Sequence, residues 1–233
     1  MLHVTNASIE QHGVAPETPS ACPLSLVLPN WVSTAHAFQD LPIDTSLYPE
    51  EAALVANAVQ GRRTEYATTR ACARQALARL GYAPVPIPTG PGGAPVWPAG
   101  VVGSLTHCKG LRAAAVASRE HARSIGIDIE RHAALPDYLT DLVTTERERL
   151  AFPSGARELP WLSLAFSAKE AAFKAWFPLT QLYLECHNID VRFTEAGTFI
   201  AQICAVTRPP AEIRARGRWA VVGDYAVTAV VIQ

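Results

Sequence analysis

Two carboxylates stand close together in a short apolar segment of the chain. The segment from Ser124 to Glu130, SIGIDIE, alternates three isoleucines with a glycine and two acids, Asp128 and Glu130. This period of two predicts a β-strand that buries the isoleucines and points both acids to the opposite face. Like charges placed side by side repel one another unless a cation lies between them. The pattern therefore predicts either exposed acids on an edge strand or a buried pair that binds a metal ion.

A third carboxylate and a lysine share a predicted helix. Glu170 and Lys174 lie four residues apart in the segment FSAKEAAFKAW, which spans Phe166 to Trp176. Ser167, three residues before Glu170, has the form of a capping box, so we expect a helix that begins there and stops at Pro178. Residues four apart lie on one face of a helix. Taken alone, this pair is typical of an exposed ion pair on an amphipathic helix.

Together, the three carboxylates have the chemistry of a magnesium site. A hard divalent cation that keeps several waters prefers carboxylate oxygens, so Mg²⁺ is the expected ion, with Mn²⁺ tolerated. Such an ion is usually shared with the phosphates of a substrate. The expected ligands are Asp128, Glu130 and Glu170.

Basic side chains fall into two groups. The segment from Arg62 to Arg79 carries five arginines, of which Arg70 and Arg74 share a helix face. These arginines form either a solvated basic face or a phosphate site, which suits the forked donors of the guanidinium group. The second group, which would add positive charge beside a pyrophosphate, consists of Lys169, Lys174 and His107.

Helices and antiparallel strands must position these side chains. A helix, or a pair of helices broken near Gly61, is expected from Pro49 to Leu80. Val101 to His107 and Arg112 to Ser118 are joined tightly enough to predict a hairpin with His107 at its mouth. Further strands are expected at 24–28, 32–38, 189–193, 199–205, 219–222 and 225–232. Each half thus combines a helix with antiparallel strands, which favours an α+β fold with two similar subdomains over a doubly wound sheet.

Composition predicts a soluble globular protein of the cytoplasm. The 233 residues are 49% apolar and 18% charged, enough to bury a core, and the net charge of −1 gives no general attraction to nucleic acid or membranes. The five cysteines form no metal-ligand spacing and suit a reducing compartment. No signal peptide or membrane-spanning run is apparent.

Four motifs, in this order, resemble those of the 4′-phosphopantetheinyl transferases. GIDIE at 126–130 and FSAKEAAFK at 166–174 are similar to the family as a whole. GSLTHC at 103–108 and RRTEYATTR at 62–70 resemble its larger monomeric (Sfp-type) class, in the siderophore-synthase and actinobacterial branch. Each motif alone is modest, but the four together are strongly specific.

The resemblance implies a magnesium-dependent transfer of 4′-phosphopantetheine from coenzyme A to a serine of an apo carrier protein. The carriers would be acyl or peptidyl carrier domains of polyketide, non-ribosomal peptide or fatty-acid synthases, and the other product 3′,5′-adenosine bisphosphate. It also implies a monomer of two pseudo-symmetric subdomains, residues 1–118 and 119–233, with coenzyme A in the cleft between them. No nucleic acid or membrane partner is implied.

The same resemblance assigns roles to individual residues. Asp128, Glu130 and Glu170 would hold magnesium on the pyrophosphate. Glu170 would also be the general base for the serine hydroxyl, and Lys174 would stabilise the leaving phosphate. Lys169 would lie alongside the pyrophosphate. The expected contacts to the other coenzyme A phosphates, chiefly the 3′-phosphate, are His107, Arg62 and Arg70, with Ser104 lining the nucleotide pocket.

One departure from the family pattern concerns the segment Gly92-Gly93-Ala94-Pro95. Relatives often carry a lysine or arginine just before the proline, whereas this segment has no cation. We therefore expect one 3′-phosphate contact to be missing, and Gly92→Lys to tighten coenzyme A binding modestly.

Two other functions are compatible with the same residues. The first is a magnesium-dependent phosphohydrolase, which would release phosphate or nucleotide without a carrier protein. The second is a non-catalytic module that binds coenzyme A or a carrier protein. The presence of Glu170 and Lys174 argues against the second, because a binding module needs no general base.

Overall fold

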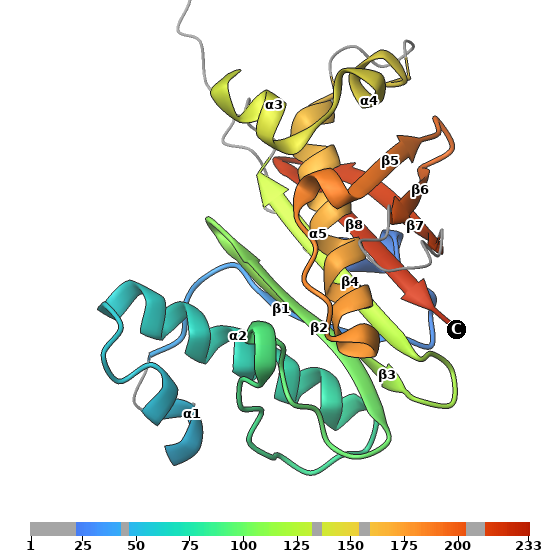
Figure 1. Cartoon of the computed structure of the whole chain (residues 1–233). Coiled ribbons are helices and arrows are strands. Elements are labelled where there is room, and N and C mark those ends of the chain that lie inside the picture. Colours follow the sequence, from blue (N-terminus) through green and yellow to red (C-terminus); the bar gives the residue numbers. More distant parts are fainter. Residues whose placement is uncertain (1–21, 43–46, 132–136, 154–158, 204–212) are drawn as a thin grey trace, which may run out of the picture.

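The computed structural model describes residues 22–42, 47–131, 137–153, 159–203 and 213–233 (Figure 1). Within them, no helix is long and apolar enough to cross a bilayer. The described cysteines, Cys22, Cys72, Cys108 and Cys186, are free thiols, and Cys204 lies outside the described residues.

Two antiparallel sheets form the framework. The first contains β1 (Ser33–Ala37), β2 (Val101–Cys108) and β3 (Leu111–Ser118), in the order β1-β3-β2. The second has the order β4-β8-β7-β6-β5; its strands are β4 (Ser124–Arg131), β5 (Ile189–Phe193), β6 (Thr198–Ile203), β7 (Ile213–Val222) and β8 (Tyr225–Ile232). The α+β prediction is confirmed, because strands pair antiparallel throughout both sheets of the described chain.

One long helix covers each sheet (Figure 1). Cys72, Ala73, Ala76 and Leu77 of α2 pack on Ala35, Ala114 and Val116 of the first sheet. Alanines of α5 pack on Val191, Phe199 and Ile203 of the second sheet. The α-helices are α1 (Pro49–Leu54), α2 (Gln60–Arg79), α3 (Thr140–Val143), α4 (Glu146–Leu150) and α5 (Trp161–Thr180). Short 3-10 helices are η1 (Pro23–Leu26), η3 (Pro91–Gly93), η4 (Asp137–Leu139) and η6 (Cys186–Asn188).

Three expectations from the sequence are wrong. The expected strand at 24–28 is the 3-10 helix η1, which has a proline in its first turn. Helix α5 begins at Trp161 rather than at Ser167, whose hydroxyl is buried and lies 2.8 Å from Thr228 Oγ1. Apolar residues just before Ser167 extend the helix towards its N-terminus. Pro178 falls in the last turn, where few intrahelical hydrogen bonds remain to be lost, so the helix continues to Thr180 and is capped by Gln181, with φ of 57°.

Side-chain hydroxyls join the two sheets along β2 and β4. Ser104 Oγ accepts a hydrogen bond from Ile127 N at 3.1 Å, and Thr106 Oγ1 accepts one from Ile129 N at 3.2 Å. Both strands are edges of their own sheets. The outward N–H groups of β4 are therefore satisfied by alternate side chains of β2, as buried backbone donors require.

Gly126 lets helix α5 lie directly on β4. A Cβ atom at this position would stand 1.9 Å from Ala171 O and 2.5 Å from Ala175 N, so only glycine fits without displacing the helix. The close approach brings the face of α5 that carries Glu170 and Lys174 next to Asp128 on the same strand.

Candidate active site

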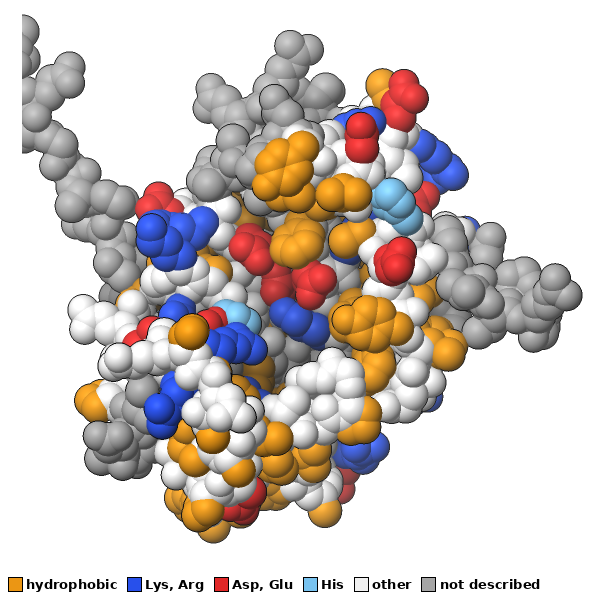
Figure 2. Space-filling model, turned by 60° about the vertical axis from the view of Figure 1, so that its left-hand side comes forward, with side chains coloured by type: hydrophobic (Ala, Val, Ile, Leu, Met, Phe, Trp, Pro, Cys, Tyr) orange, Lys and Arg blue, Asp and Glu red, His pale blue; other side chains and the backbone are white. Residues whose placement is uncertain are grey.

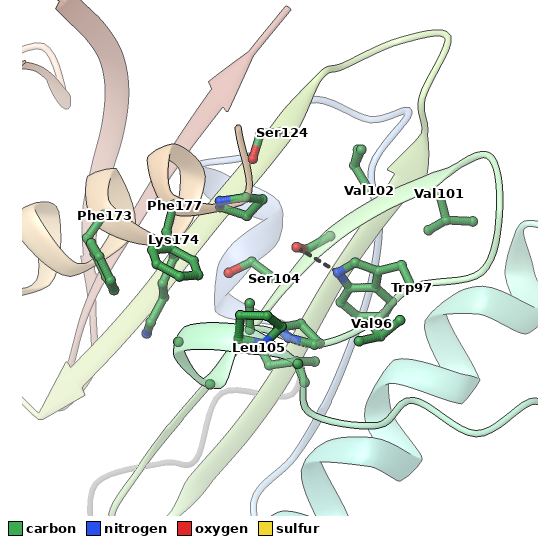
Figure 3. A pocket seen from close by; sticks show the side chains of 18 of the residues that line it. Val96, Trp97, Val101, Val102, Ser104, Leu105, Ser124, Phe173, Lys174 and Phe177 are labelled. Carbon is green, nitrogen blue, oxygen red and sulfur yellow. Dashed lines mark hydrogen bonds between the residues drawn. The ribbon is translucent and has the colours of Figure 1, made fainter. Parts of the chain in front are cut away.

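A pocket of about 500 Å³ opens between the two halves of the molecule (Figure 3). Its walls come from α2, the loop before β2, β2 itself, the β3–β4 turn and the C-terminal half of α5. Trp97 donates its indole N–H to Gly103 O at 3.0 Å, which fixes the loop against β2 (Figure 3). Six predicted site residues line the pocket: Arg62, Arg70, Ser104, His107, Glu170 and Lys174.

Asp128 has one satisfied and one unsatisfied carboxylate oxygen. The side chain is buried, and Oδ1 accepts hydrogen bonds from Thr106 Oγ1 at 3.0 Å and Lys174 Nζ at 2.6 Å. Oδ2 is equally buried but has no hydrogen-bond partner among the described residues. A buried carboxylate oxygen without a donor is costly, which indicates a place for a cation.

The two neighbouring acids are hard to ionise. Burial and the Asp128 carboxylate raise the pKa of Glu130 to about 7, with Glu170 adding to the shift and Lys174 opposing it. Burial also raises the pKa of Glu170, with Asp128 adding to the shift, although Lys174 acts in the opposite direction. The three acids therefore share one electrostatic environment that has too little positive charge.

The acids do not form a closed metal cage. No three Asp, Glu, His or Cys side chains in the described ranges lie close enough together to hold a metal ion. The ammonium group of Lys174 instead lies against Asp128. Figure 2 shows acidic and basic side chains side by side in a hollow of this face, bordered by hydrophobic side chains.

Arg62 and His107 form a small cluster with Glu65 at the pocket mouth. His107 Nε2 lies 3.1 Å from Arg62 Nη1 and also contacts Glu65 Oε1. Partial burial, with the Arg62 and Lys174 cations nearby, lowers the pKa of His107 to about 4. His107 is therefore neutral near pH 7 and offers a hydrogen bond rather than a charge.

Both halves of the chain match models of one protein family. Residues 50–117 match the family model described as the 4′-phosphopantetheinyl transferase N-terminal domain, and residues 124–230 match that of the 4′-phosphopantetheinyl transferase superfamily. The 4′-phosphopantetheinyl transferase Svp of Streptomyces mobaraensis is 46% identical over 221 residues, which cover 90% of this chain and 89% of Svp. The chain belongs to the 4′-phosphopantetheinyl transferase family.

Other relatives agree with this assignment. The 4′-phosphopantetheinyl transferase PptT of Mycobacterium tuberculosis is 42% identical over 208 residues, covering 85% of this chain and 91% of PptT. Enterobactin synthase component D of Escherichia coli K12 is 48% identical over 118 residues, covering 49% of this chain and 54% of its own. The resemblance drawn from the motifs is confirmed, and the protein is a phosphopantetheinyl transferase, an enzyme that transfers the phosphopantetheine group to carrier proteins.

Two arginines of the expected phosphate face have structural partners in the transferase. Arg70 is buried, donates to Ile87 O at 3.0 Å and Thr89 Oγ1 at 2.8 Å, and stacks on Tyr66. Arg74 donates to the fully buried Glu51 at 2.7 Å. Arg70 braces the proline-rich segment before β2 directly, and Arg74 does so through Glu51, which accepts a hydrogen bond from Ile87 N at 2.8 Å. Arg70 lines the pocket, but these donors are already in use.

Lys169 does not lie where the sequence suggested, beside a pyrophosphate. Its ammonium group is buried away from the pocket and donates to Val143 O at 2.7 Å and Glu148 Oε2 at 2.9 Å. Glu148 also accepts a hydrogen bond from Val191 N at 2.9 Å. Successive helical residues are rotated by about 100°, so Lys169 points away from the face shared by Glu170 and Lys174. We exclude Lys169 from the site.

The expectation for Gly92→Lys is also reversed. Gly92 has φ of +62°, and a Cβ atom there would lie 2.2 Å from the ring of Phe177. Any side chain at this position would push the loop off α5. We therefore expect Gly92→Lys to distort the pocket and to lower its affinity for coenzyme A, rather than to supply a phosphate contact.

Three residues of the site carry no motif that marks their role in the sequence. Thr106 holds Asp128, and its position two residues after Ser104 on a predicted strand already placed it on the same face. Arg119 and Arg123 line the pocket from the β3–β4 turn. Their only sequence signal was positive charge immediately before the SIGIDIE strand.

Proposed function

We propose that this transferase moves 4′-phosphopantetheine from coenzyme A to a serine of an apo carrier protein, in a magnesium-dependent reaction that releases 3′,5′-adenosine bisphosphate. The observation that carries the proposal is the unpartnered buried oxygen of Asp128, flanked by Glu130 and Glu170, beside a pocket lined by basic groups. A phosphohydrolase would need the same acids but no carrier protein.

The chemistry of these acids suits a hard divalent cation, although the three side chains are not gathered closely enough to form a ready-made cage. Asp128 Oδ2 lacks a donor, and the pKa values of Glu130 and Glu170 are raised by unbalanced negative charge. We assign these three residues as the ligands, completed by water, with Mg²⁺ preferred and Mn²⁺ tolerated. When bound, the ion would neutralise charge on the pyrophosphate of coenzyme A.

Glu170 and Lys174 act on the proton and on the leaving group. Glu170 lines the pocket, and its raised pKa makes it a stronger base than an ordinary carboxylate, as needed to accept the serine proton directly or through water. Lys174 is held by Asp128 at 2.6 Å, which aims its ammonium group at the same region. There it stabilises the leaving phosphate and can return a proton to it.

The pocket accommodates the nucleotide part of coenzyme A. Ser104 and the apolar side chains of Val102, Trp97 and Phe177 line its walls (Figure 3), as suits an adenosine group. Arg62 and His107 stand at the same mouth as Lys174 and supply hydrogen bonds to phosphate oxygens.

The remaining assignments describe the whole protein. We place the subdomain boundary between Ser118 and Arg119, with coenzyme A in the cleft, and expect a cytoplasmic monomer. Its partners are acyl or peptidyl carrier domains of polyketide, non-ribosomal peptide or fatty-acid synthases. The similarity to an enterobactin synthase component supports a place in siderophore assembly.

Intact mass spectrometry tests the reaction directly. Incubation with coenzyme A, magnesium and an apo carrier protein should add one phosphopantetheine group to the carrier, and none in the presence of EDTA. Glu170→Gln should abolish the addition, whereas Glu195→Gln, which alters an exposed acid of the β5–β6 turn, should not. Phosphate release without a carrier would favour the hydrolase, and coenzyme A binding without transfer would favour the binding module.

A further inference from the structure

A buried ion pair lies directly beside the reacting face of α5. Glu148 and Lys169 are each 1% exposed, and Lys169 immediately precedes Glu170 in the helix. Neither member of the pair is among the described residues that line the pocket. Burying two charges is costly unless further hydrogen bonds fix their geometry. The pair cannot contact a substrate in the pocket, so any contribution to transfer must act through the helix.

Glu148 and Lys169 join α5 to three neighbouring elements. The Glu148 carboxylate accepts hydrogen bonds from Thr145 N at 2.8 Å, where α4 begins, and from Val191 N of β5 at 2.9 Å. It also accepts one from Lys169 Nζ at 2.9 Å. Lys169 donates a second hydrogen bond, 2.7 Å long, to the carbonyl oxygen of Val143, the last residue of α3. Lys169 therefore fastens α5 to α3, α4 and β5 at one point (Figure 1).

A second point of attachment of α5 is its contact with β4. Gly126 faces the backbone of Ala171 and Ala175 so closely that no Cβ atom fits between them. Successive helical residues are rotated by about 100°, so Ala171 follows Glu170 by about 100° around the axis and Lys169 precedes it by the same angle. The reacting face that carries Glu170 thus lies between two points of attachment, one on each flank of the helix.

Rotation of α5 about its own axis would displace the reacting groups. Packing on Gly126 sets the distance of α5 from β4 but does not by itself prevent rotation, whereas the directional hydrogen bonds of the ion pair oppose it. Side-chain ends lie about 5–6 Å from a helix axis, so a rotation of about 10° moves them by about 1 Å, a displacement that lowers kcat by about a hundredfold. We propose that Glu148 is a positioning residue, which acts through Lys169 to fix the rotation of α5. This rotation places Glu170 and Lys174 for transfer, so the inference rests on the function proposed for these two residues.

Kinetics of carrier labelling, combined with urea denaturation, test the positioning role. Glu148→Gln or Lys169→Met alone leaves one buried charge without its partner and should lower the urea midpoint. The double variant Glu148→Gln/Lys169→Met removes both charges, and its glutamine oxygen can still accept hydrogen bonds from Val191 N and Thr145 N, so the midpoint should largely recover. Its kcat, measured where the variant is fully folded, should nevertheless remain about tenfold below that of the wild type, with an unchanged KM for coenzyme A.

The matched control is Arg147→Gln/Asp190→Asn, which removes a surface ion pair from the residues next to Glu148 and Val191. Its kcat and KM should equal those of the wild type. If the kcat of the double variant returns together with its stability, the positioning role is overturned and the proposed transfer stands. A raised KM for coenzyme A would also overturn it, because Lys169 would then contact the substrate. Absence of transfer by the wild-type protein would overturn both proposals, since no reacting groups would remain to be positioned.

Discussion

Asp128 is a buried carboxylate that has only half of its hydrogen-bonding capacity satisfied. Thr106 and Lys174 satisfy Oδ1, whereas Oδ2 is buried without a donor in the described chain. The same shortage of positive charge appears at Glu130, whose pKa is about 7. A folded protein tolerates such groups where binding of a ligand later compensates them.

Glu130 should make the stability of the transferase depend on pH. The folded protein keeps Glu130 protonated up to about pH 7, whereas the unfolded chain releases that proton near the ordinary value of 4.5. The free energy of unfolding should therefore fall by about 2 kcal/mol as the pH rises between these values, allowing for partial solvent screening. When the free energy of unfolding in urea is measured across this pH range, it should depend less on pH for Glu130→Gln than for the wild type.

The control for this prediction is Glu195→Gln, which alters an exposed acid. Its pH profile should follow the wild type. Added Mg²⁺ should raise the free energy of unfolding of the wild-type protein near pH 7, and should raise that of Glu130→Gln by a smaller amount. An identical pH profile for Glu130→Gln and the wild type would contradict the raised pKa.

At the scale of elements, the contact between α5 and β4 sets the catalytic geometry. Lys174 and Glu170 come from the helix, and Asp128 and Glu130 from the strand. Only the missing side chain of Gly126 lets the two backbones approach closely enough to bring these groups together. The glycine of the GIDIE motif is therefore explained by packing rather than by a turn.

Gly126→Ala should damage both stability and transfer. The added methyl group meets backbone atoms of Ala171 and Ala175, so α5 must shift, at a cost of about 2–3 kcal/mol in unfolding free energy. A displacement near 1 Å at the reacting groups lowers kcat by about a hundredfold. Denaturation and carrier-labelling kinetics check the two effects.

Gly61→Ala is the matched control for that substitution. Gly61 lies in α2 with nothing within 4 Å of its added Cβ, so alanine should raise stability by about 0.5 kcal/mol and leave kcat unchanged. Equal behaviour of the two variants would contradict the close approach of α5 to β4.

At the scale of the whole molecule, the site is divided between the two sheets. Arg62, Ser104 and His107 come from the unit built on the three-stranded sheet, and the acids from the unit built on the five-stranded sheet. The hydroxyls of Ser104 and Thr106 connect the two units along β2 and β4. These two hydroxyl contacts thus fix the groups proposed to bind phosphate relative to the acids.

Thr106→Val should weaken this connection and disturb Asp128. The substitution leaves Ile129 N–H without its acceptor and Asp128 Oδ1 without one donor, at a cost of about 1–3 kcal/mol in unfolding free energy. Urea denaturation measures the loss. Ser25→Ala, which removes an exposed hydroxyl, should cost less than about 0.5 kcal/mol. A Thr106→Val loss as small as that of the control would show that the hydroxyl does not hold the two sheets.

Local periodicity made most elements of this fold predictable. Alternation of isoleucines placed β4, turn residues placed the hairpins, and the break near Gly61 was anticipated between α1 and α2. The helix carrying Glu170 and Lys174 was predicted with the wrong start, because the apolar residues before Ser167 extend it. Such patterns reflect interactions within one element, which the sequence contains in full.

The sequence by itself determined which groups are the candidates for the chemistry: three acids, a lysine and the motifs that carry them, because residue type and local spacing are local properties. Only the tertiary structure decided which cations are available. It committed Lys169 to Glu148, Arg70 and Arg74 to structural contacts, and left Arg119 and Arg123 facing the pocket. The physical reason is that packing between segments distant in the sequence decides which groups meet. The acid or carbonyl that pairs with a cation, and the ring of Phe177 that excludes a side chain at Gly92, are examples of such groups.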